Sequence, residues 1–265
     1  MNLNIISISS KRNRQYFFDL ILKNAQAGLR AEISRGYLGM LWWIIEPLIY
    51  MGVFYVVFGH LMHRGDNNYV IFLLLGLIVW KWFHTTVNTG ANSLMNNKGL
   101  MNLVYVPKIV FPLTNVVVNT FKFFLVFFLF IVIVQFASIK PSIYWLWLPV
   151  LILIQLFLII AVTSLLASVM PFFPDLHFIL DNILLMLLFL SGIFFNISNL
   201  PKHLQKYLKL NPIAAVIDMF RQVILSGVSP DLGELACVII FSFFIFLAAL
   251  FFLRRFDRIY PKIIH

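Results

Sequence analysis

Apolar stretches of roughly 20 residues recur along the chain and alternate with short polar segments. An α-helix of about 20 residues covers about 30 Å, the thickness of the hydrocarbon core of a bilayer. The pattern predicts six membrane-spanning helices, at about residues 40–62, 69–89, 112–137, 143–170, 178–197 and 235–253. The expected fold is an all-α polytopic membrane protein in which residues 1–265 form a single transmembrane domain.

Residues 14–36, ahead of the first span, have the period of an amphipathic helix. Its apolar stripe consists of Phe18, Leu22, Ala25, Leu29 and Ile33. A polar stripe about 100° round the helix consists of Asp19, Lys23, Gln26 and Arg30. Such a helix either lies in the membrane surface or packs on the cytosolic side of the protein itself. Both alternatives make residues 1–39 a cytosolic arm with an interface helix.

Composition supports the membrane class and narrows the chemistry. The chain is 62% hydrophobic, only 11% charged, and contains 29 Phe. Its net charge of +10 is better explained by basic residues beside anionic membrane lipids than by nucleic acid. A single cysteine, Cys237, excludes an internal disulfide and a cysteine-based metal cluster, and the histidines lack metal-ligand spacing. We therefore expect no metal site and no nucleic-acid partner.

The distribution of basic residues predicts the orientation, because Lys and Arg collect on the cytosolic side. With the N-terminus inside, 12 of the 20 Lys and Arg residues are cytosolic, six are outside and two lie within spans. Both termini are then cytosolic, and residues 235–265 comprise the sixth span and a cytosolic tail. Residues 40–197 comprise spans one to five. Four of the six outside charges fall in residues 198–234, which makes that outer segment unusual.

Residues 90–111 form the longest polar cytosolic break after the N-terminus. Asn97 and Lys98 interrupt the apolar chain there. The apolar residues that follow share one face of a short predicted helix: Leu100, Leu103 and Val104. A short helix with one apolar face is suited to dock into a groove of a partner protein. The alternative is an ordinary connecting loop.

Residues 198–230 do not fit a single span, because Pro201 and the Asn211-Pro212 step interrupt helices. The helix predicted after them reaches only about 20 Å. It presents an apolar face of Ile213, Val216, Ile217, Phe220 and Ile224. It also carries Asp218 and Arg221 at a spacing that allows them to pair. This helix either dips into the membrane and returns or lies on the outer surface with a solvated ion pair.

Three ionisable residues, Glu46, Lys81 and Lys122, fall within predicted spans, where charge is costly and indicates function. Glu46 lies roughly 9 Å into the first span, and the lysines lie roughly 12–15 Å from the cytosolic ends of theirs. The three side chains could therefore meet. Three interpretations remain open: a structural pair between Glu46 and a lysine, lysines that face a water-filled path for phosphate, and lysines that extend to the interface.

The tryptophans occur as close pairs. Trp145 and Trp147 fit an outer aromatic belt, and Trp42 and Trp43 fit an inner one. Trp80 and Trp82 flank Lys81 within a span, which a belt does not explain. Aromatic faces can stack on sugar C–H groups in a conduit, and helix packing is the alternative explanation.

The sequence contains no motif for ATP binding. No G-x-x-x-x-G-K-[ST] phosphate-binding loop occurs, so if the protein uses ATP, another chain must hydrolyse it. No pairing of a nucleophile with a base is evident in the sequence, so we do not expect an enzyme.

Four short motifs occur in a fixed order along the chain. They are Leu38-Gly39-x-x-Trp42-x-x-x-x-Pro47, Leu103-Val-Tyr-Val-Pro107-Lys108 followed by Pro112, Phe173-Pro-Asp175-Leu, and Asn211-Pro212 with the later Arg221. With these motifs the chain resembles the membrane permease subunit of polysaccharide ABC exporters, over nearly its whole length. These exporters move O-antigen, capsule or teichoic-acid chains on lipid carriers. Pro174 stands where a basic residue is common in that family.

The resemblance implies a homodimer in the bacterial inner membrane with two ATP-binding subunits, which hold the ATP and Mg²⁺. Residues 90–111 would be the coupling helix, and the N-terminal helix would lie near the entry for the lipid head. Residues 198–230 would form short re-entrant helices at an outer gate that includes Asn211, Pro212, Asp218, Phe220 and Arg221. The conduit would lie between protomers and be lined by aromatic side chains.

A lipid-linked polysaccharide, with O-antigen as the first expectation, is the implied substrate. Residues expected along its path are Arg30, Arg35, Trp42, Glu46, Trp80, Lys81, Trp82 and Lys122. Of these, the basic residues are the candidates for contact with a pyrophosphate. Two other functions remain open: a drug or small-lipid exporter of the same fold, and a membrane transferase that acts on polyprenol lipids.

Overall fold

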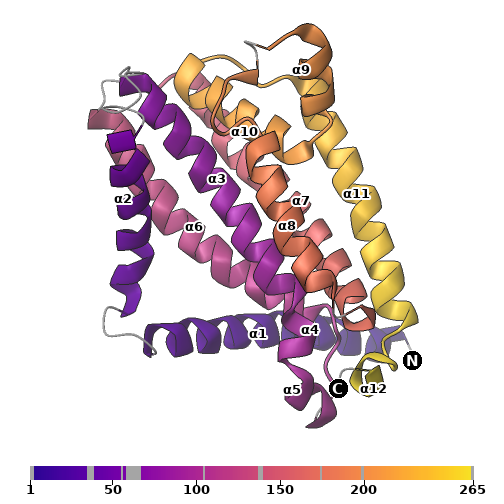
Figure 1. Ribbon diagram of the computed structural model, residues 1–265. Coiled ribbons are helices and arrows are strands. Elements are labelled where there is room, and N and C mark those ends of the chain that lie inside the picture. The colour runs from indigo at the N-terminus through magenta and orange to yellow at the C-terminus, as the bar shows by residue number, and fades with distance from the viewer. Residues whose placement is uncertain are drawn as a thin grey trace.

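The computed structural model describes residues 3–34, 39–54, 56–57, 67–103, 105–136, 140–173, 175–197 and 200–263. These residues form helices joined by short turns and contain no strand (Figure 1). The predicted all-α class is therefore confirmed for the described part of the chain.

Four stretches are long and apolar enough to cross a membrane: Tyr69–Ala91, Val110–Phe136, Ile143–Phe172 and Leu232–Arg255. They belong to helices α3 (Asn67–Ala91), α6 (Val110–Phe136), α7 (Leu148–Val169, extended by a 3-10 turn at each end) and α11 (Leu232–Arg255). These helices coincide with predicted spans two, three, four and six. The length of the apolar runs was therefore sufficient to locate them.

Helices α2 (Trp42–Phe54) and α8 (Leu176–Leu190) lie where the first and fifth spans were predicted. With 13 and 15 residues, they reach only about 20–23 Å. The predicted fifth span extended to residue 197, but α8 ends at Leu190. A turn follows in which Gly192 has φ 66°, a left-handed conformation that only glycine adopts without strain. Residues 58–62 of the predicted first span lie outside the described residues.

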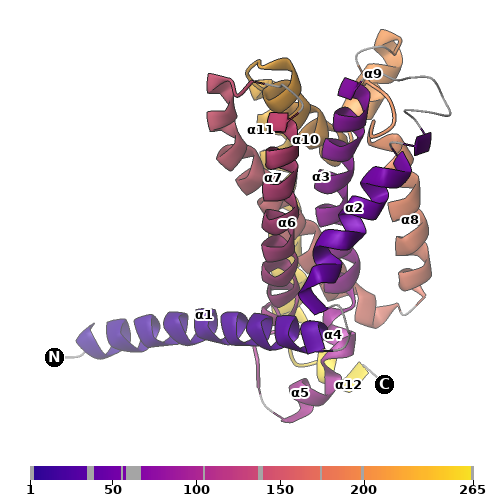
Figure 2. The same cartoon turned by 90° about the vertical axis from the view of Figure 1, so that its left-hand side faces the viewer.

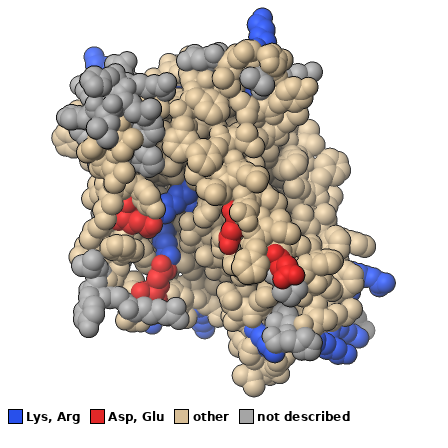
Figure 3. Space-filling model, viewed as in Figure 1, with Lys and Arg blue, Asp and Glu red and all other residues tan. Residues whose placement is uncertain are grey.

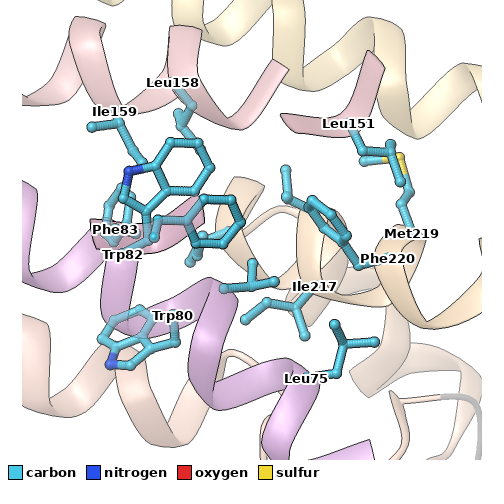
Figure 4. Packing of buried hydrophobic residues seen from close by; sticks show 14 of the residues in the cluster. Leu75, Trp80, Trp82, Phe83, Leu151, Leu158, Ile159, Ile217, Met219 and Phe220 are labelled. Carbon is cyan, nitrogen blue, oxygen red and sulfur yellow. The ribbon is translucent and has the colours of Figure 1, made fainter. Parts of the chain in front are cut away.

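Helices α3, α6 and α7 form the centre of the bundle, and α11 packs along α7. Apolar side chains from α3 and α7 converge on the same layer as those of the short helix α10 (Figure 4). Helices α3 and α7 approach closely at Gly90, where a Cβ would lie 2.1 Å from Cγ2 of Thr163. The buried side-chain amide N–H of Gln155 in α7 donates to the backbone oxygen of Val79, at 2.8 Å. These contacts fix the rotation of α7 against α3.

Helix α1 (Leu3–Ser34) lies across one end of the bundle and contacts α6 (Figure 2). It buries Ile21 and Ala25 against the bundle, whereas Phe18 and Leu22 remain exposed. Of the predicted apolar stripe, Ala25 therefore packs on the bundle, whereas Phe18 and Leu22 are exposed on the surface of the helix. Helices α4 (Ser93–Asn96), α5 (Lys98–Leu103) and α12 (Tyr260–Ile263) lie at the same end (Figure 1).

Helices α9 (Lys202–Lys209) and α10 (Pro212–Arg221) lie at the opposite end. Asn211 caps α10 by accepting a hydrogen bond from the Ile213 N–H, and Pro212 begins the helix. The predicted apolar face of α10 and the π-helical turn that follows, Gln222–Ser226, is fully buried against α3, α7 and α11. Burial of this face between α3, α7 and α11 fits the alternative in which the helix dips between the spans, and it does not fit a solvated surface helix.

Candidate functional site

Two ion pairs lie along α2. Lys81 of α3 contacts Glu46 with 2.6 Å between Nζ and Oε1, and Lys122 of α6 contacts Glu32 of α1 at 2.5 Å. The predicted pair of Glu46 with a lysine is therefore found for Lys81. Pairing of Lys122 with Glu46 is wrong, because the end of α1 brings Glu32 to that lysine. Glu32 was not among the residues predicted from the sequence, because nothing local marks a partner 90 residues away.

Aromatic side chains of α2 complete both ion pairs. The indole N–H of Trp43 donates to Glu32 Oε1 at 3.3 Å, and Lys122 lies 5.3 Å from the centre of the Trp43 ring. Lys81 lies 5.0 Å from the centre of the Tyr50 ring. A cation over an aromatic face is stabilised electrostatically. Each lysine thus binds a carboxylate and an aromatic ring. Trp42, by contrast, is 50% exposed.

Trp80 and Trp82 are each only 4% exposed, so neither presents a ring face to the surface of the protomer. Trp82 stacks on Phe123 of α6 with 4.0 Å between ring centres, and Trp80 lies beside Phe83 and His84. Figure 4 shows both indoles within the apolar layer. Their burial among neighbouring side chains fits the interpretation that these two tryptophans serve helix packing and not stacking on sugars.

A polar network that the sequence analysis missed joins α3 to α8. Asn88 donates to Asp181 Oδ1 at 2.6 Å, and Asp181 Oδ2 lies 3.6 Å from His177 Nε2. Asn92 Nδ2 lies 3.3 Å from His177 Nδ1. A usable signal was present, since Asp181 is a lone acid in an apolar run and follows His177 by four residues. Among the described residues, no group of three acids, histidines or cysteines could hold a metal ion.

The two sides of the bundle differ in charge. Helices α2 and α8 flank α3 on one side, with α11 away from them (Figures 1 and 2). Acidic and basic side chains gather on that side, over α2 and α3 (Figure 3). Helix α7 carries no Asp, Glu, Lys or Arg, and those of α11 fall in its first and last turns. Among the described helices, charge away from the helix ends is therefore concentrated on the side formed by α2, α3 and α8, together with Lys122 of α6, and we call this side the charged face.

Arg221 holds α10 in place at the opposite end. Its guanidinium is 4% exposed and donates to the backbone oxygens of Gly192 at 2.7 Å, Ile193 at 2.9 Å and Phe72 at 3.2 Å. It also lies 3.4 Å from the centre of the Phe72 ring. Gly76 leaves room for the guanidinium, because a Cβ at this position would lie 2.6 Å from an Arg221 nitrogen.

The predicted pairing of Asp218 with Arg221 is wrong, although both lie in the described part of the chain. Asp218 accepts a hydrogen bond from Gln222 at 2.9 Å, while Arg221 turns inward to carbonyl oxygens. Packing of α10 against α3 and beside the turn after α8 places the guanidinium among these backbone oxygens, to which it donates three hydrogen bonds. Phe220 is fully buried, and Asn211 donates to Ser191 Oγ at 3.1 Å. Most of the residues predicted at an outer gate therefore fix α10 within the bundle.

The predicted coupling segment forms α4 and α5. Leu103 is 83% exposed and Leu100 is also exposed, whereas Met101 is buried against the base of the bundle. The Asn97 amide donates to the Ser93 oxygen at 2.8 Å, which joins α4 to α5, and Lys98 is half-buried. Arg30 is exposed on α1. Val104 and Arg35 lie outside the described residues. The apolar tip of α5 thus has no cover from the described part of this chain.

Residues near the C-terminus form hydrogen bonds that connect the helices at the end of the bundle where α4 and α5 lie. Tyr105 donates to Asp257 Oδ2 at 2.9 Å, and this hydrogen bond raises the pKa of Tyr105. Tyr260 is fully buried and donates to the Ser168 oxygen at 3.0 Å, and burial raises its pKa. Lys108, also buried, donates to the Val106 oxygen at 3.2 Å. The base of α6, α7 and α11 is therefore tied to the segment that follows α5.

The described residues have the fold of a polytopic helical membrane protein, with an exposed apolar helix at one end and a charged lateral face. Residues 24–225 match the model of the ABC-2 type transporter family, and the chain belongs to that family. It is 25% identical to an O-antigen export system permease protein RfbA of Klebsiella pneumoniae over 84% of this chain and 86% of that protein. It is 28% identical to the protein of that name in Myxococcus xanthus, over 80% and 82% of the two chains. It is also 28% identical to the polysialic acid transport protein KpsM of Escherichia coli, over 83% and 88%.

Proposed function

We propose that this chain is the membrane permease subunit of an ABC exporter that moves a lipid-linked polysaccharide, O-antigen in the first instance, out across the bacterial inner membrane. The family and the names of its relatives support the substrate class. The observation that carries the mechanism is the charged face, which sets one side of the bundle apart from the side formed by α7 and α11. ATP and Mg²⁺ bind to a separate subunit.

The charged face lines a conduit between two copies of the chain. Ionisable side chains at mid-height in a membrane face a partner or a water-filled cavity, because charge exposed to hydrocarbon is strongly unfavourable. Helix α11, which lacks such charge between its ends and has few buried residues, faces the lipid. A homodimer brings two charged faces together and shields both from lipid.

In the proposed topology, the chain crosses the membrane six times, with α2 and α8 as the first and fifth spans. Helix α1 lies at the cytosolic surface, and its exposed Phe18 and Leu22 enter the lipid boundary. Both termini are cytosolic, which places Arg254 and Arg255 at the inner interface. Helix α10 is re-entrant from the outer side. The ion pair of Lys209 with Glu234 supports this arrangement. It joins the end of α9 to the first turn of α11, at the end of the bundle where α10 begins.

Lys81 and Lys122 bind the diphosphate of the lipid carrier. Glu46 and Tyr50 on α2, which contact Lys81, lie about one helical turn apart. Trp43, which contacts Lys122, lies about one turn before Glu46. The two ammonium groups therefore lie along the same stripe of α2, where positive charge can meet a diphosphate. Arg30 and Arg35 contribute positive charge at the entry.

The tip of α5 docks into a groove of the ATP-binding subunit. Leu100 and Leu103 supply the apolar contact, and the ties of Tyr105 and Tyr260 carry motion from α5 to the ends of α7 and α11. Closure of the ATP-binding subunits on ATP thereby separates or tilts the two protomers.

The test is reconstitution of this chain with its ATPase in proteoliposomes that hold a fluorescent undecaprenyl-diphosphate-linked oligosaccharide. We expect ATP-dependent transfer of the oligosaccharide to the opposite leaflet, and no ATP hydrolysis by this chain alone. Transfer of small amphipathic dyes in place of the oligosaccharide would instead support a drug or small-lipid exporter. Sugar transfer chemistry without an ATPase would support a membrane transferase.

A further inference from the structure

The polar network between α3 and α8 has more hydrogen-bonding capacity than its members use. Asp181 offers about four lone-pair positions on its two carboxylate oxygens, and Asn88 occupies one of them, while His177 Nε2 lies 3.6 Å away, beyond hydrogen-bonding distance. The amide oxygens of Asn88 and Asn92 accept no hydrogen bond from any described residue. The network can therefore bind further O–H groups without losing its own contacts.

The setting of the network excludes lipid as its neighbour. Asp181 and His177 have side chains that are 47% and 43% exposed, and Asp181 lies within an apolar helix. A carboxylate at this position faces water or another polar partner, because hydrocarbon would leave its charge unsolvated. Phe178 lies about one turn before Asp181 and is also exposed. Hydrogen-bonding groups beside an open aromatic ring match the two surfaces of a sugar, its hydroxyl groups and its C–H face.

We infer that Asn88, Asn92, His177 and Asp181 form a contact site for the hydroxyl groups of the sugar chain as it passes. The inference rests on the proposed function, since it takes the charged face as the wall of the conduit. Sugar O–H groups donate to the free lone pairs of Asp181 and of the two amide oxygens. Contacts of this kind suit a moving polymer, because each replaces water and yet is weak enough to pass to the next sugar.

The experiment uses the complete complex with its ATPase in proteoliposomes and two fluorescent probes. One probe is undecaprenyl diphosphate with a single sugar, and the other carries a long oligosaccharide. Asp181→Leu removes the carboxylate, and Asp181→Asn keeps a hydrogen bond to Asn88 and therefore the seating of α8. The matched control is Asn182→Leu, because the Asn182 amide is exposed and donates to Phe178 in its own helix.

We expect Asp181→Leu to lower the initial rate for the long oligosaccharide by about tenfold below saturation, the size typical of a hydrogen bond to a charged group. Asp181→Asn should lower it less, and both variants should carry the single-sugar probe within about twofold of the wild type. Asn182→Leu should carry both probes normally.

Equal losses for both probes, together with a lower melting temperature, would show that the network only fastens α8 to α3 and would overturn the inference. Unchanged transport of the long probe by both Asp181 variants would overturn it as well. If the wild-type complex carries neither probe, the proposed function fails along with the inference, which distinguishes that result from failure of the contact site alone.

Discussion

Replacement of Arg221 by Met should destabilise the protein by about 3 kcal/mol. The change removes the guanidinium donor from the backbone oxygens of Gly192 and Ile193, and each unsatisfied buried group costs about 1–3 kcal/mol; the Phe72 oxygen, within α3, keeps its helical partner. Relief from burying the guanidinium, which is 4% exposed, offsets part of that loss. For a chain of this size, about 3 kcal/mol corresponds to a fall in Tm of about 6–12 °C.

The assay is thermal unfolding of the purified protein in detergent. The matched control is Arg254→Met, because Arg254 is exposed in the last turn of α11 and should leave the Tm nearly unchanged. A Tm for Arg221→Met within about 2 °C of the wild type would refute the assignment of Arg221 as the group that holds α10.

A double substitution sharpens the same test. Gly76→Ala places a Cβ about 2.6 Å from an Arg221 nitrogen, so this change alone should also lower the Tm. In the Arg221→Met background, that guanidinium is absent and the cost of the alanine should fall. Contacting residues give non-additive effects of about 0.5–3 kcal/mol, so strictly additive losses would contradict the geometry of this contact.

Three further predictions concern other parts of the molecule. Gly90→Ala should lower the Tm, since its Cβ would lie 2.1 Å from a Thr163 methyl carbon, and Thr163→Ser should restore much of the loss; no rescue would argue against this contact. Leu103→Asp should stop export while the membrane dimer still assembles on size-exclusion chromatography, and normal export would identify the segment as a plain loop. Lys122→Met should lower export but cost only about 1 kcal/mol of stability, because its partner Glu32 is 45% exposed; a large fall in Tm with unchanged export would assign Lys122 a purely structural role.

Much of the architecture was predictable because it depends on local physics. Apolar runs long enough to cross a bilayer gave the positions of α3, α6, α7 and α11. The Asn211-Pro212 step gave the start of α10, because a side-chain cap and a proline at the first position are properties of neighbouring residues. The polar break after α3 was located for the same reason, although which of its residues are exposed required the structure.

Only the tertiary structure decided the partners of the charged side chains. Spacing along one helix favoured Asp218 for Arg221, but packing of α10 beside the turn after α8 brings the guanidinium to backbone oxygens instead. Lys122 meets Glu32 because α1 crosses the base of α6, and Asp181 meets Asn88 because α8 lies on α3. Helix formation and burial follow from residues within a few turns of one another. The choice of a polar partner depends on how helices rotate and cross, and residues scattered over the whole chain set that arrangement through their packing.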